Sequence, residues 1–370
     1  RQLCMKPIDL MDDVLLHAPW WMQCPKDGEP AIALSGRVRL SRNLEDTVFP
    51  GRASESQLRS SRLALSRAIA EANLFPGARH LNVLDMRPLD WVTLEERRLL
   101  TYNPDTKYDI TNFILTPDQS WAIGINEYDH LYLQAAQPGL DLKNCLQQVF
   151  HWEAAIGEHV SYAFDEQYGY LTVHPGDMGT GMRASVIMHL PALVISDQIE
   201  HVSRSLTQLG LMIHGISNDD QNPFAGNLFV VSNRWTLGIR ESAMVERLTR
   251  VCRDLIVQEK RSRQILLEDS MNVVCDLVSR AYGVLTHAYQ LHTLETWDML
   301  SALWLGVDLG MIQSISVETL QNLIVSIQPG HLQQSEGKML SDSDCQLARA
   351  RLIHSKVLAA VDRGPGTQDR

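Results

Sequence analysis

The chain has 370 residues, of which 45% are hydrophobic and 21% charged, and this composition is typical of a globular protein with more than one ordinary domain. Its formal net charge of −11 argues against nucleic-acid and anionic-membrane partners, whose affinity comes largely from Lys and Arg, but leaves room for a local basic pocket. The six cysteines form no CxxC pair and no apolar run reaches membrane-spanning length, so we expect a cytoplasmic protein without a zinc site.

Residues 1–78 are predicted to form a small, mainly helical N-terminal part. Prolines interrupt its first 34 residues. Ser54 and Gln57 then have the spacing of a capping box, and the sequence before Pro76-Gly77 is helical. The apolar positions of that helix share one face: Leu58, Leu65 and Ile69.

An arginine-dense segment, SGRVRLSRN at 35–43, precedes this helix. Arg37 and Arg39 are two positions apart, so in an extended chain they point the same way. Two guanidinium groups on one face could bind a polyphosphate, because each offers bidentate donors. The simpler alternative from spacing alone is a solvated surface strand.

Residues 79–240 predict an α+β domain, a mostly antiparallel sheet flanked by helices. Two helical patterns, DLKNCLQQVFHWEAAIGEHV and SDQIEHVSRSLTQLG, interrupt a series of short β-like runs. Those runs are HLNVLDM, NFILT, WAIGINEYDHLYLQ, YGYLTVH, RASVIMHL, LMIHGIS and NLFVVSN.

The run at 121–134 alternates like a single strand. Its polar face would carry Asn126, Tyr128, His130 and Tyr132. An amide, an imidazole and two phenols on one face indicate either a solvated surface or the floor of a site.

Two polar loops follow in the same domain. In HPGDMGTGMRAS, three glycines precede Arg183, and glycines allow backbone N–H groups to approach a phosphate, although a simple turn explains them equally. In the loop at 213–222, Asp219 and Asp220 could act as bases or hold a cation, or could be solvated. The remaining residues, 241–370, are predicted to be helical.

Together these segments resemble the phosphagen (guanidino) kinase superfamily, and specifically its bacterial protein-arginine kinase branch. The matching segments are SGRVRLSRNLEDTVFP, INEYDHLYLQ, HVSYAFDEQYGYLTVHPGDMGTGMRASVIMHLPALV, AGNLFVVSNRWTLG and the C-terminal helices. The resemblance covers about residues 20–355 and implies an ATP:guanidino phosphotransferase fold. It also implies that arginines bind Mg-ATP while carboxylates orient and deprotonate the acceptor guanidinium.

The resemblance implies roles for particular positions. Arg37, Arg39 and Arg183 match arginines that bind the nucleotide, with Ser185 beside them.

Other positions depart from the family pattern. Tyr128 replaces a catalytic Glu, Tyr132 and His214 replace phosphate-binding arginines, and Asp219 falls on a second catalytic Glu. Further changes are His174 for Cys and Asp177 for Asn. A tyrosine, with an ordinary pKa of ~10, is a poor base at neutral pH and cannot bind phosphate as a cation does.

The C-terminal region shows a similar departure. The protein-arginine kinase branch carries a phosphoarginine-receptor motif, Arg-Asp-x-x-Arg-Ala, and the matching stretch here is CQLARA at 345–350. Arg349 remains, whereas Cys345 and Gln346 replace the Arg-Asp pair. An anion pocket that lacks one guanidinium and its orienting carboxylate should be weak.

From these departures we expect a pseudokinase that acts as a binding or regulatory subunit and binds ATP and Mg weakly or not at all. The first alternative is an active protein-arginine kinase in which Asp219, Asp220, Glu127 or Asp129 supplies the carboxylate. The second is a scaffold without any nucleotide. The resemblance further implies a homodimer, an arginine-containing protein partner, and a small zinc-binding activator.

Overall fold

The computed structural model describes residues 19, 22, 32–74, 77–82, 86–100, 111–116, 118–217 and 222–362. The two loop aspartates, Asp219 and Asp220, lie outside the described residues, as do Pro76 and almost all of the irregular N-terminal segment. Among the described residues, no helix combines the length and the apolarity that crossing a membrane would require.

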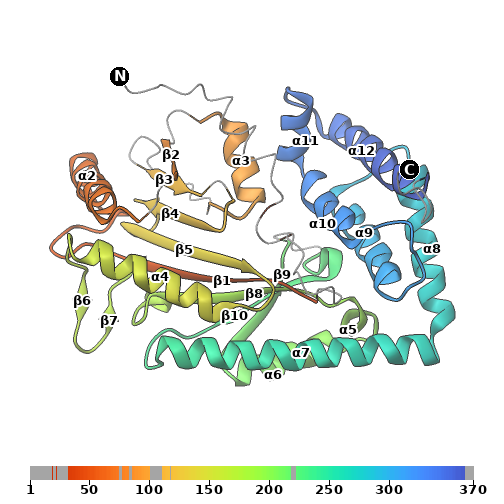
Figure 1. The fold of residues 1–370 in the computed structure, drawn as a ribbon, viewed down its shortest axis with the longest axis horizontal. Helices are drawn as coiled ribbons and strands as arrows, with labels where there is room; N and C mark the ends of the chain where they lie inside the picture. The colour runs from red at the N-terminus through yellow and green to blue at the C-terminus, as the bar shows by residue number, and fades with distance from the viewer. Residues whose placement is uncertain are drawn as a thin grey trace, which may run out of the picture.

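An eight-stranded antiparallel sheet forms the centre of the molecule (Figure 1), which confirms the predicted fold class. The strand order is β2-β3-β4-β5-β1-β8-β10-β9. The strands are β1 (Ala33–Arg42), β2 (Arg79–Asn82), β3 (Asn112–Leu115), β4 (Trp121–Ile125), β5 (Leu131–Pro138), β8 (Met182–His189), β9 (Leu211–Gly215) and β10 (Leu228–Asn233). A two-stranded hairpin of β6 (Phe164–Asp165) and β7 (Gly169–Tyr170) lies outside this sheet.

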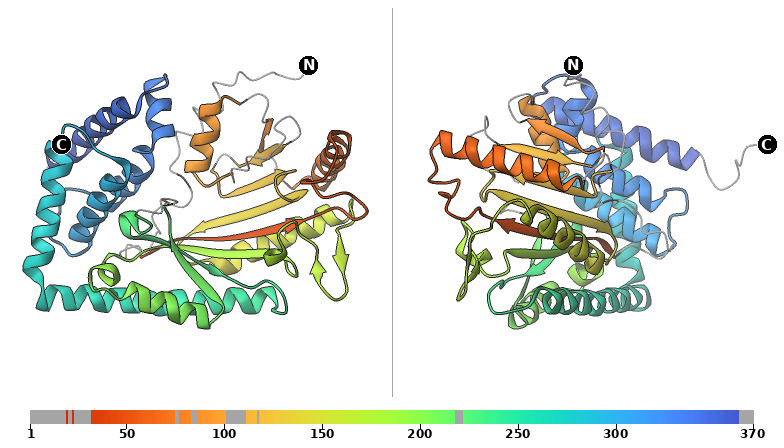
Figure 2. Two further views of the ribbon diagram at one scale, coloured as in Figure 1. Left: turned by 180° about the vertical axis from the view of Figure 1, so that it is seen from behind. Right: turned by 60° about the vertical axis from the view of Figure 1, so that its left-hand side comes forward.

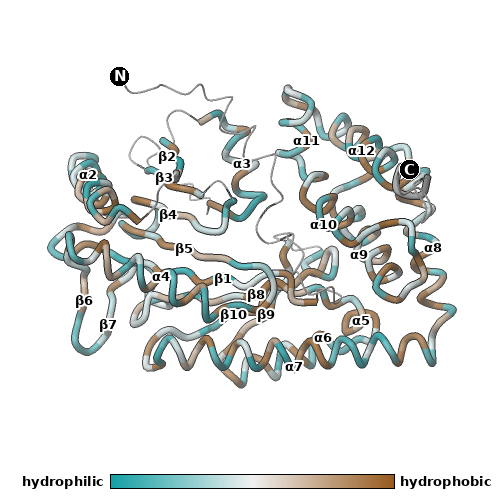
Figure 3. The backbone as a smooth tube through the Cα atoms, in the orientation of Figure 1, coloured by the Kyte–Doolittle hydropathy of each residue, from teal (hydrophilic) through white to brown (hydrophobic). Residues whose placement is uncertain are grey.

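Helices cover one face of the sheet along its whole width. They are α2 (Glu55–Ala72), α4 (Leu142–Gly157), α6 (Ile199–Gln208) and α7 (Glu241–Asp269). Their apolar residues join Val38, Leu133 and Val186 of the strands in one continuous core. Figure 3 shows hydrophobic and hydrophilic segments alternating along α7, as expected of a helix with one buried face.

The opposite face is covered only in part. The helix α3 (Pro88–Glu96) packs over the β2–β3 end, and the C-terminal helices gather next to it, on the side of the molecule away from α2 (Figure 2). These are α8 (Met271–His287), α9 (Thr293–Asp308), α10 (Val317–Ser326), α11 (Pro329–Glu336) and α12 (Asp342–Asp362). A second core, which includes Leu94 and Trp304, connects them to the sheet.

The N-terminal helix agrees with its prediction, but the segment before it does not. Ser54 caps α2 in a complete capping box with Gln57, and the three predicted apolar positions are buried. By contrast, β1 is a central strand between β5 and β8, whereas the sequence placed it in a separate N-terminal part. Its alternating pattern gave no indication of two partner strands.

Two other predictions need correction. Residues 121–134 form a hairpin, with β4 and β5 joined by a turn at 126–130, and not one strand. Helix α7 packs on β8, β10 and α4, so it belongs to the α+β domain. The helical C-terminal region therefore begins at α8 and not at residue 241.

Candidate active site

The strand register brings the predicted nucleotide residues to one face of the sheet. Directly paired residues of antiparallel strands point to the same face. Arg37 pairs with Ser185 and Arg39 with Arg183, while Tyr132 pairs with Ser41 on the other side of β1. His214 reaches the same face through β10. This face is opposite the one that α4 and α7 cover.

The arginines of this face are held by short polar side chains. Arg37 donates from Nε to Ser185 Oγ at 3.3 Å, and burial lowers its pKa. Arg183 donates from Nε to Asp177 Oδ1 at 2.7 Å. Because the pair is partly exposed, a phosphate can compete with Asp177 for the Arg183 guanidinium. The cluster is therefore suited to a polyphosphate.

The glycine turn before Arg183 serves packing. Gly179 and Gly181 have φ values of 107° and 59°, which favour glycine. A Cβ on Gly181 would lie 2.6 Å from the Ser41 carbonyl oxygen, and one on Gly179 would lie 2.8 Å from the Thr236 carbonyl oxygen. The Gly179 N–H donates to Tyr170 O. These contacts support the interpretation as a turn between strands.

Tyr132 lies within the site and is nearly inaccessible to solvent. The Arg39 guanidinium carbon lies 4.4 Å from the centre of its ring, in a cation–π contact. Its hydroxyl donates to Gln134 Oε1. Burial raises the pKa of Tyr132, so the phenol stays neutral. The ring therefore occupies space beside Arg39 without supplying a charge.

Tyr128 lies in the turn between β4 and β5. Its ring contacts the His174 ring, with centroids 5.0 Å apart. The two aromatic rings therefore pack against each other beside this turn. The same turn holds Asn126, which donates to Leu58 O, and His130, whose Nδ1 accepts from the Leu44 N–H. Neither of these two side chains shares the predicted strand face.

Glu127 is the carboxylate that the structure brings to this face. Its side chain is buried, and neither carboxylate oxygen has a hydrogen-bond partner among the residues that the structure describes. Burial raises its pKa to about 7, an effect that the Arg39 charge opposes and the Asp129 charge supports. A buried carboxylate without donors is costly, and a carboxylate with a pKa near neutrality suits a general base.

The other carboxylates named by the sequence differ from Glu127. Asp129 Oδ1 accepts from Asn43 Nδ2 at 2.7 Å and from the Val173 N–H at 2.8 Å, so it fixes the turn. Asp219 and Asp220 lie outside the described residues. Two of these four carboxylates lie in the described residues, Glu127 and Asp129. Of the two, Glu127 is the one whose oxygens accept no hydrogen bond from the described residues.

Sequence reasoning missed Arg98, which follows α3. It donates from Nη2 to Ile216 O at 2.9 Å, two residues after His214. Burial is the main cause that lowers the pKa of His214, and the charges of Arg98, Arg37 and Arg183 add to it. Arg98 thus belongs to the electrostatic surroundings of the site. Nothing in EERRLL distinguishes it from a surface arginine.

Arg349 is not part of this face. It lies on α12 with 2% of its surface exposed. Its Nε donates to Ile327 O at 2.8 Å and its Nη1 to Leu291 O at 2.6 Å. Two of its donors thus serve backbone carbonyls, an arrangement that stabilises the helical region and differs from the predicted anion pocket.

The described residues provide ligands for a phosphate and not for a metal ion. Among the described residues, no group of His, Cys, Asp or Glu could hold a metal ion. Mg²⁺ in this fold would therefore arrive on nucleotide phosphates, its usual ligands in kinases.

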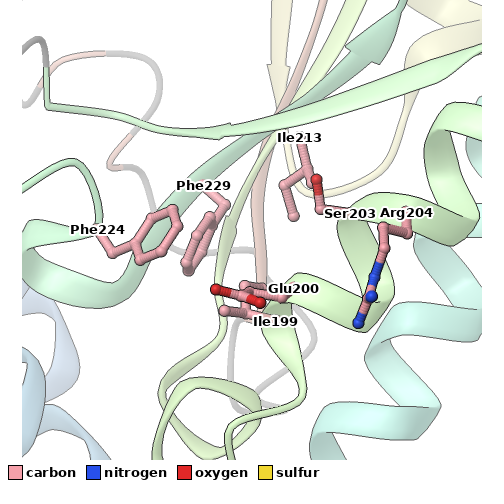
Figure 4. A pocket seen from close by; sticks show the side chains of 7 residues that line it. All are labelled: Ile199, Glu200, Ser203, Arg204, Ile213, Phe224 and Phe229. Atoms are coloured by element: carbon pink, nitrogen blue, oxygen red, sulfur yellow. The ribbon is translucent and has the colours of Figure 1, made fainter. Parts of the chain in front are cut away.

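A hollow of about 330 Å³ lies between α6 and β9 (Figure 4). Its residues Ile213 and Phe229 belong to the covered face, so it is separate from the arginines.

Solved structures of two kinases share this fold. A crystal structure of lombricine kinase matches with a TM-score of 0.56 at 22% identity, covering 64% of this chain and 67% of that one. The duplicated taurocyamine kinase from Schistosoma mansoni, with transition-state analogue components, gives a TM-score of 0.56 at 22% identity over 66% of this chain and 35% of its own. At 22% identity, the likeness to these structures shows a shared fold and nothing about activity.

Sequence comparison extends the match to nearly the whole chain. Residues 67–262 match the model for the ATP:guanido phosphotransferase C-terminal catalytic domain, and residues 271–365 match that for the protein-arginine kinase McsB C-terminal domain. Protein-arginine kinase of Shouchella clausii is 37% identical, covering 91% of this chain and 94% of its own. That of Bacillus subtilis is 36% identical, covering 91% and 93%. This chain belongs to the ATP:guanido phosphotransferase family, in its protein-arginine kinase branch.

Proposed function

We propose that the protein transfers the terminal phosphoryl group of Mg-ATP to the guanidinium of arginine in a protein substrate, with Glu127 as the working carboxylate. The names of the relatives support this kinase reading better than the pseudokinase that the sequence first suggested. The observation that carries the proposal is the buried Glu127 carboxylate, which has no hydrogen-bond donor in the described part of the chain and has a pKa raised to about 7.

The chemistry requires a base because an arginine side chain, with a pKa above ~12, is fully protonated at neutral pH. In the reaction the bond between the γ-phosphorus and the bridging oxygen breaks, and a bond from a guanidinium nitrogen to that phosphorus forms. The nitrogen loses one proton, which Glu127 accepts, and ADP leaves. A donor-free carboxylate can receive two N–H groups of the acceptor in a bidentate pair.

The arginines supply the other half of the reaction. The transferred group spreads negative charge over its oxygens, so catalysis depends on positioning and neutralisation. Arg37, Arg39 and Arg183 would hold the phosphates, and Ser185 would orient Arg37. With Glu127 as the base and the arginines as the phosphate-binding groups, Tyr128 and Tyr132 line the site and do not react.

A second candidate is a pseudokinase that acts as a binding or regulatory subunit. The observation that favours it is the cation–π contact between the Arg39 guanidinium and the Tyr132 ring, at a position where the family resemblance predicts an arginine. In this reading nucleotide binds weakly or not at all. Under either reading we propose the branch's associations, namely a homodimer in the cytoplasm, an arginine-containing protein partner and a small zinc-binding activator.

The test is an assay for phosphoarginine. The purified full-length chain is incubated with Mg-ATP and an arginine-rich protein such as casein, and acid-labile phosphate on arginine is measured by mass spectrometry. The proposal predicts phosphoarginine that increases with time and enzyme concentration. ATP binding without any phosphoarginine, with and without a zinc-binding activator of the family, would support the pseudokinase and overturn the kinase.

A further inference from the structure

A groove lies beyond the C-terminal end of β1. Its first wall is the segment 44–49, which leads from β1 towards α2, and its second wall is the β6–β7 hairpin with the residues beside it. Figure 1 shows this segment and the hairpin at the same end of the sheet. The groove has a volume of about 430 Å³. Backbone bonds join its walls, because the Ala163 N–H donates to Asn43 O at 2.8 Å and the Glu45 N–H donates to Ser161 O at 3.0 Å.

Both walls expose apolar side chains. Phe164 on the hairpin is 59% exposed, and Val48 on the other wall is 43% exposed. The Phe164 ring is oriented by an edge contact with the Tyr170 ring, whose centroid lies 5.2 Å away. Leu44 and Leu171 complete the apolar lining. Single exposed apolar residues are common on protein surfaces, but two on the two walls of one groove indicate a contact surface.

The rim of the groove is acidic. Glu45 and Asp46 line it and are exposed, and Glu166 is exposed in the turn of the hairpin. None of these three carboxylates forms an ion pair with the residues that the structure describes. Unpaired carboxylates around an apolar surface attract a cationic partner and repel an acidic one. The groove therefore fits a segment that combines apolar and basic side chains.

The first wall is fixed to the turn that carries Glu127. The Leu44 N–H donates to His130 Nδ1 at 3.3 Å, and the Phe49 ring meets the same imidazole edge-on, with centroids 6.3 Å apart. The His130 N–H in turn donates to Asn43 Oδ1 at 3.0 Å. The groove and the proposed base therefore belong to one connected arrangement of residues.

The second wall leads to the same turn. Leu171 precedes His174 by three residues, and the His174 ring contacts the Tyr128 ring. Three extended residues span at most about 11 Å, so the groove lies within a short peptide segment of the acceptor side. A substrate with its arginine at Glu127 would place a residue about three positions away in the groove.

We propose that this groove binds the stretch of the protein substrate that flanks the acceptor arginine, with an apolar side chain between the two walls and basic side chains at the rim. The inference rests on the proposed function, because it names the substrate segment that the same site would select. An apolar anchor in a groove supplies much of the affinity of such a contact. The charged rim adds an attraction that salt weakens.

Peptide binding tests this inference without requiring phosphoryl transfer. Fluorescence anisotropy measures the affinity of the full chain, without nucleotide, for a short fluorescein-labelled peptide. This first peptide holds one arginine, a phenylalanine at the third position on either side of it, and lysines beside each phenylalanine. A second peptide has serine in place of both phenylalanines. Phe164→Ser should weaken binding of the first peptide roughly 5- to 30-fold and change that of the second little, since the lost contact is to the anchor.

Matched variants complete the design. Phe164→Leu keeps an apolar side chain and should retain most of the affinity for the first peptide. Val257→Ser removes a similarly exposed apolar side chain of α7 and should change the affinity for neither peptide. Glu45→Gln combined with Asp46→Asn should weaken the first peptide about 2- to 10-fold at low salt, and less at high salt, because ions screen exposed charges. Glu246→Gln, at an exposed position of α7, is the control for this pair.

The outcomes are distinct. Equal affinity of the wild type and Phe164→Ser for the first peptide, an equal loss for both peptides, or no peptide binding by the wild type would each overturn the inference. An altered sedimentation coefficient of Phe164→Ser with unchanged peptide affinity would also overturn it, because the groove would then join two copies of the chain.

Selective loss of affinity for the first peptide supports the inference even if the wild type forms no phosphoarginine. In that case the proposed function fails while the assignment of the groove stands. Phosphoarginine formation with the same KM for the first peptide in the wild type and Phe164→Ser would have the opposite meaning. The proposed function would then stand and the groove would not bind the substrate.

Discussion

The two halves of the candidate site differ in the side chains that line them. Arg37, Arg39 and Arg183 lie on β1 and β8, where Arg37 donates to Ser185 and Arg183 donates to Asp177. The turn after β4 and the strand β5 carry Tyr128 and Tyr132, at positions where the resemblance to the family predicts a carboxylate and an arginine. The first half would face the nucleotide, and the second would face the acceptor guanidinium.

The difference shows that two aromatic side chains on the acceptor side do not leave that side without a carboxylate. Glu127 is adjacent in sequence to Tyr128, yet it is buried near Arg39 and has no hydrogen-bond donor among the described residues. Tyr128 instead contacts the ring of His174.

The largest expected effect tests the nucleotide side. Arg183→Ala removes one charge from the phosphate cluster and should lower phosphoryl transfer about 10³-fold or more, since such arginines stabilise the transferring group. Turnover of Mg-ATP on an arginine-rich protein measures it, with Arg280→Ala as the control for an exposed arginine. Activity that survives Arg183→Ala would show that the residues assigned by family resemblance are not the site.

A smaller effect is expected on the acceptor side, and it is measured as a change in the free energy of unfolding with pH. The pKa of Glu127 rises from its ordinary 4.5 to about 7 in the folded protein. The folded state therefore retains a proton that the unfolded state has lost, and the free energy of unfolding falls as pH rises between these values. Relative to Glu127→Gln, the wild type should lose up to roughly 3 kcal/mol across this window.

Urea unfolding of both proteins at about pH 4 and at about pH 8 measures this difference. The isosteric amide does not ionise, so its unfolding free energy lacks this contribution. A difference between the two proteins that stays constant with pH would mean that Glu127 is ordinarily ionised and solvated, and would remove the basis for assigning it as a base.

The smallest effect concerns the C-terminal region. Arg349→Met removes the donors to Ile327 O and Leu291 O and should lower the free energy of unfolding by about 1–3 kcal/mol, the cost of leaving buried polar groups unpaired. Thermal unfolding measures this loss of stability. The control is Arg351→Met, at an exposed position of the same helix. A destabilisation equal to that of the control would favour the predicted anion-binding role over the structural one.

The fold class and the common face of Arg37 and Arg39 could be predicted from the sequence because their signals are local. The capping box of Ser54 defines α2, and the two-residue spacing of Arg37 and Arg39 places both on one face. The role of β1 as a central strand could not be predicted, because its two partners, β5 and β8, come about 100 and 150 residues later in the chain.

The acceptor side was harder to predict for a similar reason. The alternation through residues 121–134 continues across the turn, so the pattern alone does not reveal the hairpin. Arg98 reaches the site through tertiary packing of α3, and the donors of Arg349 are used by carbonyls far away in sequence. Burial and hydrogen-bond pairing are three-dimensional properties that residue type does not report.

The pH dependence of phosphoarginine formation by the wild type and Glu127→Gln tests the role of Glu127 most directly. If Glu127 accepts the guanidinium proton, kcat/KM of the wild type rises with pH through about 7, because only the ionised carboxylate can act as a base. Glu127→Gln should then be slower by about 10²- to 10⁴-fold and should lack that ionisation. Equal rates for the two proteins over this pH range would contradict the account.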